Sequence, residues 1–169
     1  MITLSHFPRN KEKFVRLIEF FKEILDICGE LNITPVLNGS LAVFAYTGNH
    51  EMHVNDVDLA CSEMEFPRII SVLEERCIGY KLREWHVLQI FRNDIKVELD
   101  SVEYWYKGLP MDCETLQVDN YQVSMLGLNG LMEFYRRGLK DREEKTDTNE
   151  KMKYDGLKLK FDALERIKS

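Results

Sequence analysis

Two aspartates separated by one residue, Asp56 and Asp58, are the side chains of this sequence best suited to chemistry. They lie in a stretch from 53 to 61 that alternates apolar and polar residues, which predicts a β-strand. Side chains two residues apart on a strand project from one face, so the two carboxylates are expected to lie close together. Such a pair is costly unless a cation lies between them, and Mg²⁺ prefers these oxygen ligands. An isolated D-x-D more often marks an exposed strand end or a loop cap, so the neighbouring motifs decide the interpretation.

A glycine-serine pair, Gly39-Ser40, precedes the aspartates. It stands between a short apolar run, Val36-Leu37, and an apolar stretch that predicts a helix. Glycine lets the backbone approach a bound phosphate, and the N-terminus of a helix favours an anion. The pair is therefore a candidate phosphate cradle.

A third acidic position follows on a later predicted strand, where Glu98 and Asp100 share one face. The residues alone leave open which of the two joins the aspartates. A phosphate cradle, paired aspartates and a third carboxylate suit nucleotidyl transfer, in which metal ions bridge the phosphates while a hydroxyl attacks in line.

In this order the motifs resemble those of the nucleotidyltransferase superfamily, in particular its small stand-alone and antibiotic-modifying members with a minimal polymerase-β-like fold. The family pattern of apolar-Gly-Ser, acidic-apolar-acidic and apolar-acidic-apolar is matched by residues 37–42, 55–59 and 97–100. The resemblance implies a central mixed sheet. It also implies Mg²⁺-dependent transfer of a nucleoside monophosphate from a nucleoside triphosphate to a hydroxyl of a small molecule or protein.

The resemblance implies roles for individual residues as well. Those expected to be catalytic are Asp56, Asp58, Glu98 and Asp100. The metal ligands among them would be Asp56, Asp58 and Glu98, and the nucleotide would contact Gly39, Ser40 and Lys140. Glu98 is slightly preferred to Asp100 as the third ligand because it has an apolar residue on each side, as in the family pattern.

The phosphate contacts expected from the family are incomplete in this sequence. Many members with small acceptors carry an arginine and a threonine shortly before the first aspartate, whereas residues 52–55 here are Met-His-Val-Asn. A different residue is therefore expected to contact the phosphates. The densest positive cluster, from Arg136 to Arg142, is a candidate for this role. Trp105 and Tyr106 are candidates for stacking on the base.

The apolar patterning predicts a mixed α+β fold, with a central mixed sheet flanked by helices. Helices are expected over 10–30, from 39, and over 62–76, 128–137 and 147–167; strands over 36–37, 53–61, 85–92, 95–100, 116–118 and 121–123. A charged link is expected over 140–145. One nucleotidyltransferase-like domain would then span 1–125, and a C-terminal helical extension over 126–169 would pack on it.

Composition limits the partners of this 169-residue chain, whose formal net charge is -6. Residues 1–135 carry 12 basic and 21 acidic groups, which argues against binding long nucleic acid and favours a small substrate. The four cysteines lie far apart, so neither a zinc module nor a disulfide framework is indicated. No stretch is apolar enough to suggest a membrane span or a signal peptide, and a cytoplasmic protein is expected.

A second function class stays open at this point. The same fold could serve as a non-catalytic nucleotide-binding or regulatory module, such as an antitoxin-type partner protein. Retention of all three acidic positions favours the enzyme, whereas the lack of a recognisable acceptor-binding domain favours the module.

Overall fold

The computed structural model describes residues 1–143 and 147–169, and its centre is one mixed β-sheet. Within these ranges eight strands follow the spatial order β1-β7-β8-β2-β3-β6-β5-β4. The strands are β1 (Ile2–Thr3), β2 (Val36–Asn38), β3 (Asp56–Cys61), β4 (Gly79–Arg83), β5 (Val87–Arg92), β6 (Ile95–Ser101), β7 (Cys113–Val118) and β8 (Tyr121–Leu126).

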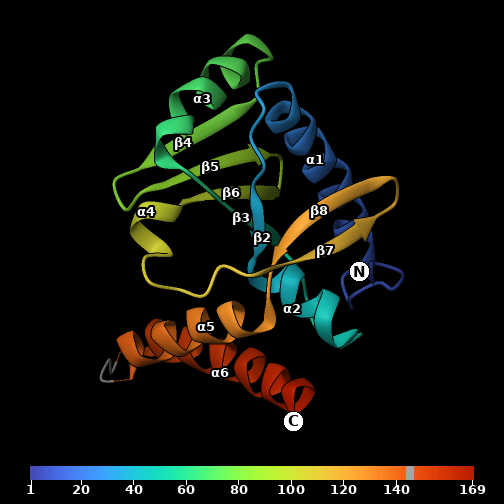
Figure 1. Cartoon of the computed structure of the whole chain (residues 1–169), viewed down its shortest axis with the longest axis vertical. Coiled ribbons are helices and arrows are strands. Elements are labelled where there is room, and N and C mark those ends of the chain that lie inside the picture. The colour runs from blue at the N-terminus through green and yellow to red at the C-terminus, as the bar shows by residue number, and fades with distance from the viewer. Residues whose placement is uncertain (144–146) are drawn as a thin grey trace.

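Helices pack around this sheet and complete the fold (Figure 1). They are α1 (Lys11–Glu30), α2 (Gly39–Thr47), α3 (Phe66–Glu75), α4 (Val102–Trp105), α5 (Leu128–Arg142) and α6 (Thr148–Lys168), with a 3-10 turn, η1, at Glu63–Glu65. Helix α1 packs against β3 and β6, and the last helix, α6, packs on α5 and α2. The α+β architecture with a mixed sheet and a C-terminal helical tail, expected from the sequence, is confirmed.

The register of the three central strands decides which side chains meet. Strand β3 runs antiparallel to β2 and places Asp58 opposite Asn38. On its other side β3 runs parallel to β6 and places Asp58 opposite Glu98. Since directly paired residues point to the same face, these side chains lie in one row across the sheet.

The opposite face of the central strands is buried under α1. The apolar residues that alternate with the acidic ones, such as Val57 and Val97, are fully buried. Helix α1 contributes an apolar stripe at three- and four-residue spacing to the same core, the pattern of an amphipathic helix. Phe161 and Leu164 of α6 also belong to this core, so α6 is fixed by burial of apolar surface.

Several boundaries differ from the sequence-based expectation for local reasons. Strand β3 begins at Asp56 and not at residue 53, because the side chain of Asn10 bonds both the N–H and the C=O of Val54 in place of a neighbouring strand. Ser62 accepts a hydrogen bond from the Met64 N–H at the start of η1, so α3 begins only at Phe66.

The charged link expected over 140–145 is partly helical. Residues 140–142 form the last turn of α5, while 144–146 lie outside the described residues. Within the described ranges, the structure contains no helix whose length and apolar character would let it cross a membrane.

Candidate active site

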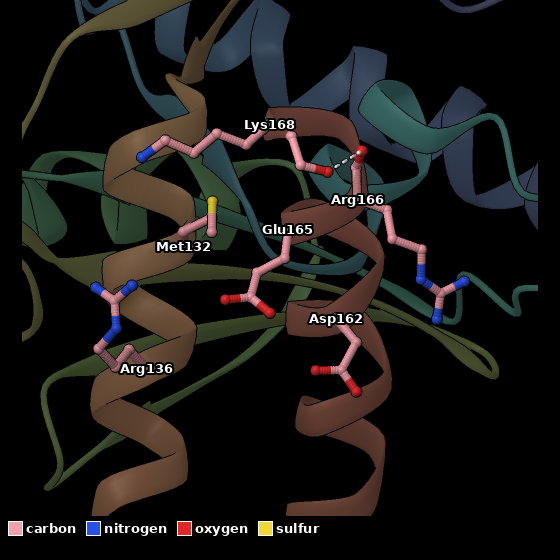
Figure 2. Close-up of a pocket in the computed structure, with 7 residues that line it drawn as sticks. Met132, Arg136, Asp162, Glu165, Arg166 and Lys168 are labelled. Atoms are coloured by element: carbon pink, nitrogen blue, oxygen red, sulfur yellow. Dashed lines mark hydrogen bonds between the residues drawn. The ribbon is translucent and has the colours of Figure 1, made fainter.

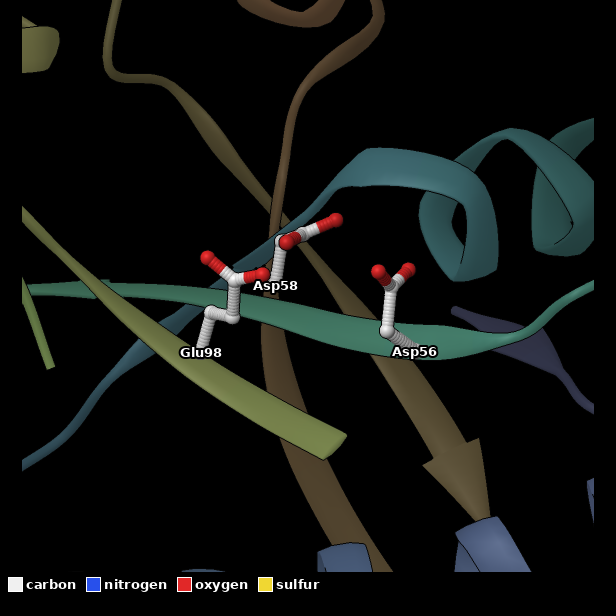
Figure 3. Close-up of side chains that lie close together, drawn as sticks. All are labelled: Asp56, Asp58 and Glu98. Carbon is white, nitrogen blue, oxygen red and sulfur yellow. The ribbon is translucent and has the colours of Figure 1, made fainter. Parts of the chain in front are cut away.

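Three carboxylates meet on the central strands, and they come from Asp56 and Asp58 on β3 and Glu98 on β6 (Figure 3). One oxygen of each lies within 4.8 Å of one oxygen of each other residue. The parallel register, with Asp58 opposite Glu98, produces this arrangement from two residues on one strand and one on the next. Figure 3 shows all three side chains rising from the same side of the sheet.

Mutual repulsion and burial make the acidic cluster, Asp56, Asp58 and Glu98, unfavourable without a cation. Burial raises the pKa of Asp58 well above its usual range, and the charges of Asp56, Asp100 and Glu98 raise it further. Each of these effects disfavours the ionised carboxylate. A hard divalent cation bound to the same oxygens would remove the penalty.

Asp100 lies one step farther along β6 than Glu98 and outside the acidic cluster. It is paired with Ala60, and its carboxylate accepts a hydrogen bond of 3.3 Å from the Tyr106 hydroxyl. Burial, followed by the charge of Glu98, raises the pKa of Asp100 to about 7. The structure therefore brings Glu98 to the two aspartates and leaves Asp100 beside them.

Asn38 supplies a further oxygen close to this row. Its side-chain N–H donates to the Tyr106 hydroxyl at 2.6 Å, which directs its Oδ1 elsewhere. Although Asn38 is buried, this Oδ1 has no hydrogen-bond partner in the part of the chain described. Buried polar atoms are normally satisfied, so an unpaired oxygen on the residue in register with Asp58 suits a site that receives a ligand. The donor set as a whole fits Mg²⁺, which takes oxygen ligands.

Gly39 is held against Asp58 by the turn from β2 into α2. Its φ is +69°, a conformation that L side chains rarely adopt. A Cβ at this position would overlap Asp58 Oδ2 and lie 2.8 Å from Asp58 Cγ. The glycine therefore leaves room for the aspartate itself, whereas the sequence suggested room for a phosphate.

Ser40 is joined to the far end of the chain. Lys160, on α6, donates a hydrogen bond of 2.8 Å from Nζ to Ser40 Oγ. Burial lowers the pKa of Lys160, while the charges of Asp58 and Asp56 act in the opposite direction. A half-buried ammonium thus lies beside the Gly39-Ser40 turn and within electrostatic reach of the acidic cluster.

Lys160 is not among the site residues expected from the sequence, although the sequence contains a signal for a buried lysine at this position. It stands within the apolar stripe that Leu157, Phe161 and Leu164 form at helical spacing, where an apolar residue is expected. A lysine in such a stripe indicates a buried charge with a partner elsewhere in the fold.

The cationic residues that the sequence suggested lie on α5. Lys140 is exposed in the last turn of α5. Arg136 pairs with Glu133, and Arg142 pairs with Glu150. Of the two aromatic candidates, Trp105 donates its indole N–H to the Trp85 carbonyl, while Tyr106 is buried beside Asp100.

Cavities occur on both sides of α6. One of about 720 Å³ lies between α5 and α6 and mixes acidic and basic groups, among them Arg136, Glu165 and Arg166 (Figure 2). It contains none of the residues of the acidic cluster. A second, of about 450 Å³, lies between α6 and the loop before β3, and Lys160 lines it together with His53 and Arg166. Glu51 is the acidic residue of this lining, and Lys160 connects the second cavity to the acidic cluster through the charges of Asp58 and Asp56.

Comparison with known proteins gives matches at the level of structure. No protein-family model matches the sequence, and no curated protein sequence matches it significantly. The structure of ANT(2")-Ia in complex with adenylyl-2"-tobramycin is 12% identical, with a TM-score of 0.58 over 90% of this chain and 98% of that one. The lincosamide antibiotic adenylyltransferase LnuA, lincomycin-bound, is 11% identical, with a TM-score of 0.51 over 82% and 94%.

A third solved structure extends the likeness over nearly the whole chain. A nucleotidyltransferase-like protein from Paracoccidioides brasiliensis is 13% identical, with a TM-score of 0.58 over 95% of this chain and 78% of that one. Identities this low carry the fold alone. The chain has the nucleotidyltransferase fold, as the resemblance of its motifs predicts.

Proposed function

We propose that this protein is a magnesium-dependent nucleotidyltransferase that moves a nucleoside monophosphate from a nucleoside triphosphate to a hydroxyl of a small molecule or protein. The observation that carries the proposal is the acidic cluster, whose three carboxylates lie on adjacent parallel strands beside Gly39 and Lys160. A cluster of exposed surface acids does not require a half-buried lysine and a positive-φ glycine beside it.

The residues divide into three roles, which are metal binding, phosphate contact and proton transfer. Asp56, Asp58 and Glu98 hold the metal, which when bound neutralises charge on the phosphates. Ser40 and Lys160 contact the phosphates, so Lys160 takes the part that the sequence assigned to Lys140. The cavity that Lys160 and Arg166 line, with Glu51 as its acidic residue, gives the nucleotide a lining with more basic than acidic groups.

Asp100 is proposed to accept the proton of the acceptor hydroxyl or to orient it. A carboxylate whose pKa is raised to about 7 is well matched to proton transfer near neutral pH. The Tyr106 hydroxyl holds one carboxylate oxygen of Asp100, which fixes the direction of the other.

The structural neighbours support a small acceptor. ANT(2")-Ia was solved with adenylyl-2"-tobramycin, and LnuA is an adenylyltransferase solved with lincomycin. Both ligands are small molecules, and the neighbours match this chain over most of their lengths. We therefore favour the enzyme over a non-catalytic regulatory module.

Calorimetry with ATP, CTP, GTP and UTP, each with and without Mg²⁺, tests the proposal. We expect at least one triphosphate to bind in a Mg²⁺-dependent manner, because the acidic cluster repels phosphate until a cation is present. Pyrophosphate release is then measured with that triphosphate, with tobramycin and lincomycin as first acceptors and mass analysis of the protein itself. Absence of metal-dependent binding for all four triphosphates would contradict the proposal.

Replacing Lys160 with methionine is expected to weaken triphosphate binding by about tenfold, the scale of one charge-assisted contact to phosphate. Metal binding in the absence of nucleotide should not weaken, since the lysine repels a cation. The matched control is Lys158→Met, two residues away on α6, where the lysine is exposed and pairs with Asp162. Calorimetry measures the triphosphate affinity of both variants. Equal affinities in the two would show that Lys160 does not contact the triphosphate.

A further inference from the structure

A lysine lies among the three carboxylates of the acidic cluster. Lys96, on β6, is paired with Asp56 just as Glu98 is paired with Asp58, so the four side chains form a two-by-two array on adjacent parallel strands. The Lys96 ammonium contacts the Glu98 carboxylate and lies 3.7 Å from Asp56 Oδ2. Its side chain is only 29% exposed.

The position of Lys96 alters the charge that a metal ion meets. Three ionised carboxylates carry a formal charge of -3, and Lys96 reduces it to -2, which matches one divalent ion. The Lys96 ammonium reaches both Glu98 and Asp56. It is therefore the counter-charge of these two carboxylates in the metal-free protein.

We propose that Lys96 is a resident cation of this site: it holds Glu98, cancels one of the three carboxylate charges, and so leaves a cluster that one divalent ion neutralises and that takes up one such ion in the absence of nucleotide. The inference rests on the proposed function, since it assumes that the carboxylates bind metal. It makes Lys96 a positioning residue, because it acts through Glu98 and Asp56.

A purely structural ion pair has a different consequence. Removing Lys96 would then lower stability by the same amount with and without a divalent ion. A resident cation, in contrast, competes with the metal for the same oxygens, so its removal strengthens metal binding.

Metal titration of the whole protein separates these cases. Mn²⁺ is titrated without nucleotide into the parent, Lys96→Met, Lys96→Arg and a control, Lys81→Met. Lys81 is an exposed lysine on the edge strand β4, in register with Gln89, which is itself in register with Glu98. Calorimetry gives the affinity and the number of ions per chain.

We expect the parent to bind one Mn²⁺ ion per chain. The Lys96→Met variant should bind its first Mn²⁺ ion at least about tenfold more tightly than the parent, because a nearby positive charge has been removed. Lys96→Arg and Lys81→Met should stay within about twofold of the parent, because the charge at the cluster is kept. Unchanged or weaker Mn²⁺ binding in Lys96→Met, or two ions in the parent, would overturn the inference.

Thermal unfolding provides a second readout that tolerates a less stable variant. In EDTA, Lys96→Met should unfold at a lower temperature than the parent because the carboxylates of Glu98 and Asp56 lose their counter-charge. Added Mn²⁺ should then raise its unfolding temperature by more than it raises that of the parent, since a tighter ligand stabilises the folded state more. An equal gain in both proteins counts against a resident cation.

The outcomes also distinguish this inference from the proposed function. If the parent binds Mn²⁺ and Lys96→Met binds it no better, only the role of Lys96 fails. If Mn²⁺ binding follows the inference but no triphosphate binds, the nucleotidyltransferase proposal fails and Lys96 keeps its role. If neither protein binds Mn²⁺, both are wrong.

Discussion

Replacing Asp56 and Asp58 together with asparagine is expected to abolish metal-dependent triphosphate binding, with a loss of about a hundredfold or more in affinity. Neutral amides keep the shape of the two side chains and remove the charge that holds the cation. Glu98 alone, already in contact with Lys96, cannot replace them. Calorimetry with the triphosphate that the parent prefers, in the presence of Mg²⁺, measures the loss.

The fold should survive this double substitution. Ionised Asp58 is disfavoured by burial and by its acidic neighbours, so its neutralisation removes an unfavourable term from the metal-free protein. In EDTA at neutral pH, the unfolding temperature should therefore not fall. Asp112→Asn/Glu114→Gln, at an exposed acidic pair with the same spacing, is the matched control and should bind triphosphate like the parent. If the variant with asparagine at positions 56 and 58 binds triphosphate like the parent, the metal-site assignment is wrong.

Gly39→Ala should be the second most damaging change, because the new Cβ overlaps the carboxylate of Asp58. Asp58 must move, and the acidic cluster then loses its geometry. We expect Mn²⁺ and triphosphate affinities to fall together by about tenfold or more, together with a loss of stability from the strained φ. Ser40→Ala, which removes one hydrogen bond, should cost only about 1 kcal/mol. Calorimetry and thermal unfolding of both variants test this order.

Gly48→Ala isolates the contact with Asp58 from the backbone strain. Gly48 ends α2 with a φ of +59°, close to that of Gly39, but a Cβ there would have nothing within 4 Å. The Gly48→Ala variant should be less stable than the parent and should bind Mn²⁺ and triphosphate with the affinities of the parent. If Gly39→Ala and Gly48→Ala show the same loss of stability and no loss of binding, the turn at Gly39 is merely structural.

The sequence predicted the parts of the site that depend on local periodicity. Asp56 and Asp58 share a face because a strand repeats every two residues, and this follows from the sequence alone. The choice between Glu98 and Asp100 did not follow, because both lie on the same face of β6. Only the register with β3 decides it, by setting Glu98 opposite Asp58 and Asp100 opposite Ala60.

The other parts of the site depend on contacts distant in sequence. Lys160 meets Ser40 because α6 packs on α2, a contact between residues 120 positions apart. Its neighbours in sequence give no indication of that partner. Likewise, the edge strand β4 was missed because its residues are largely exposed and lack the apolar alternation of a half-buried strand.

The origin of Lys160 in α6 has a consequence for the order in which the site is built during synthesis. Chains are made from the N-terminus, and a domain generally folds as a unit. The strands that bear the three carboxylates are complete by Ser101, long before α6 exists. The strands of the acidic cluster, with Lys96 on one of them, are therefore synthesised before the helix that carries Lys160, and Lys160 reaches Ser40 only when that last helix docks.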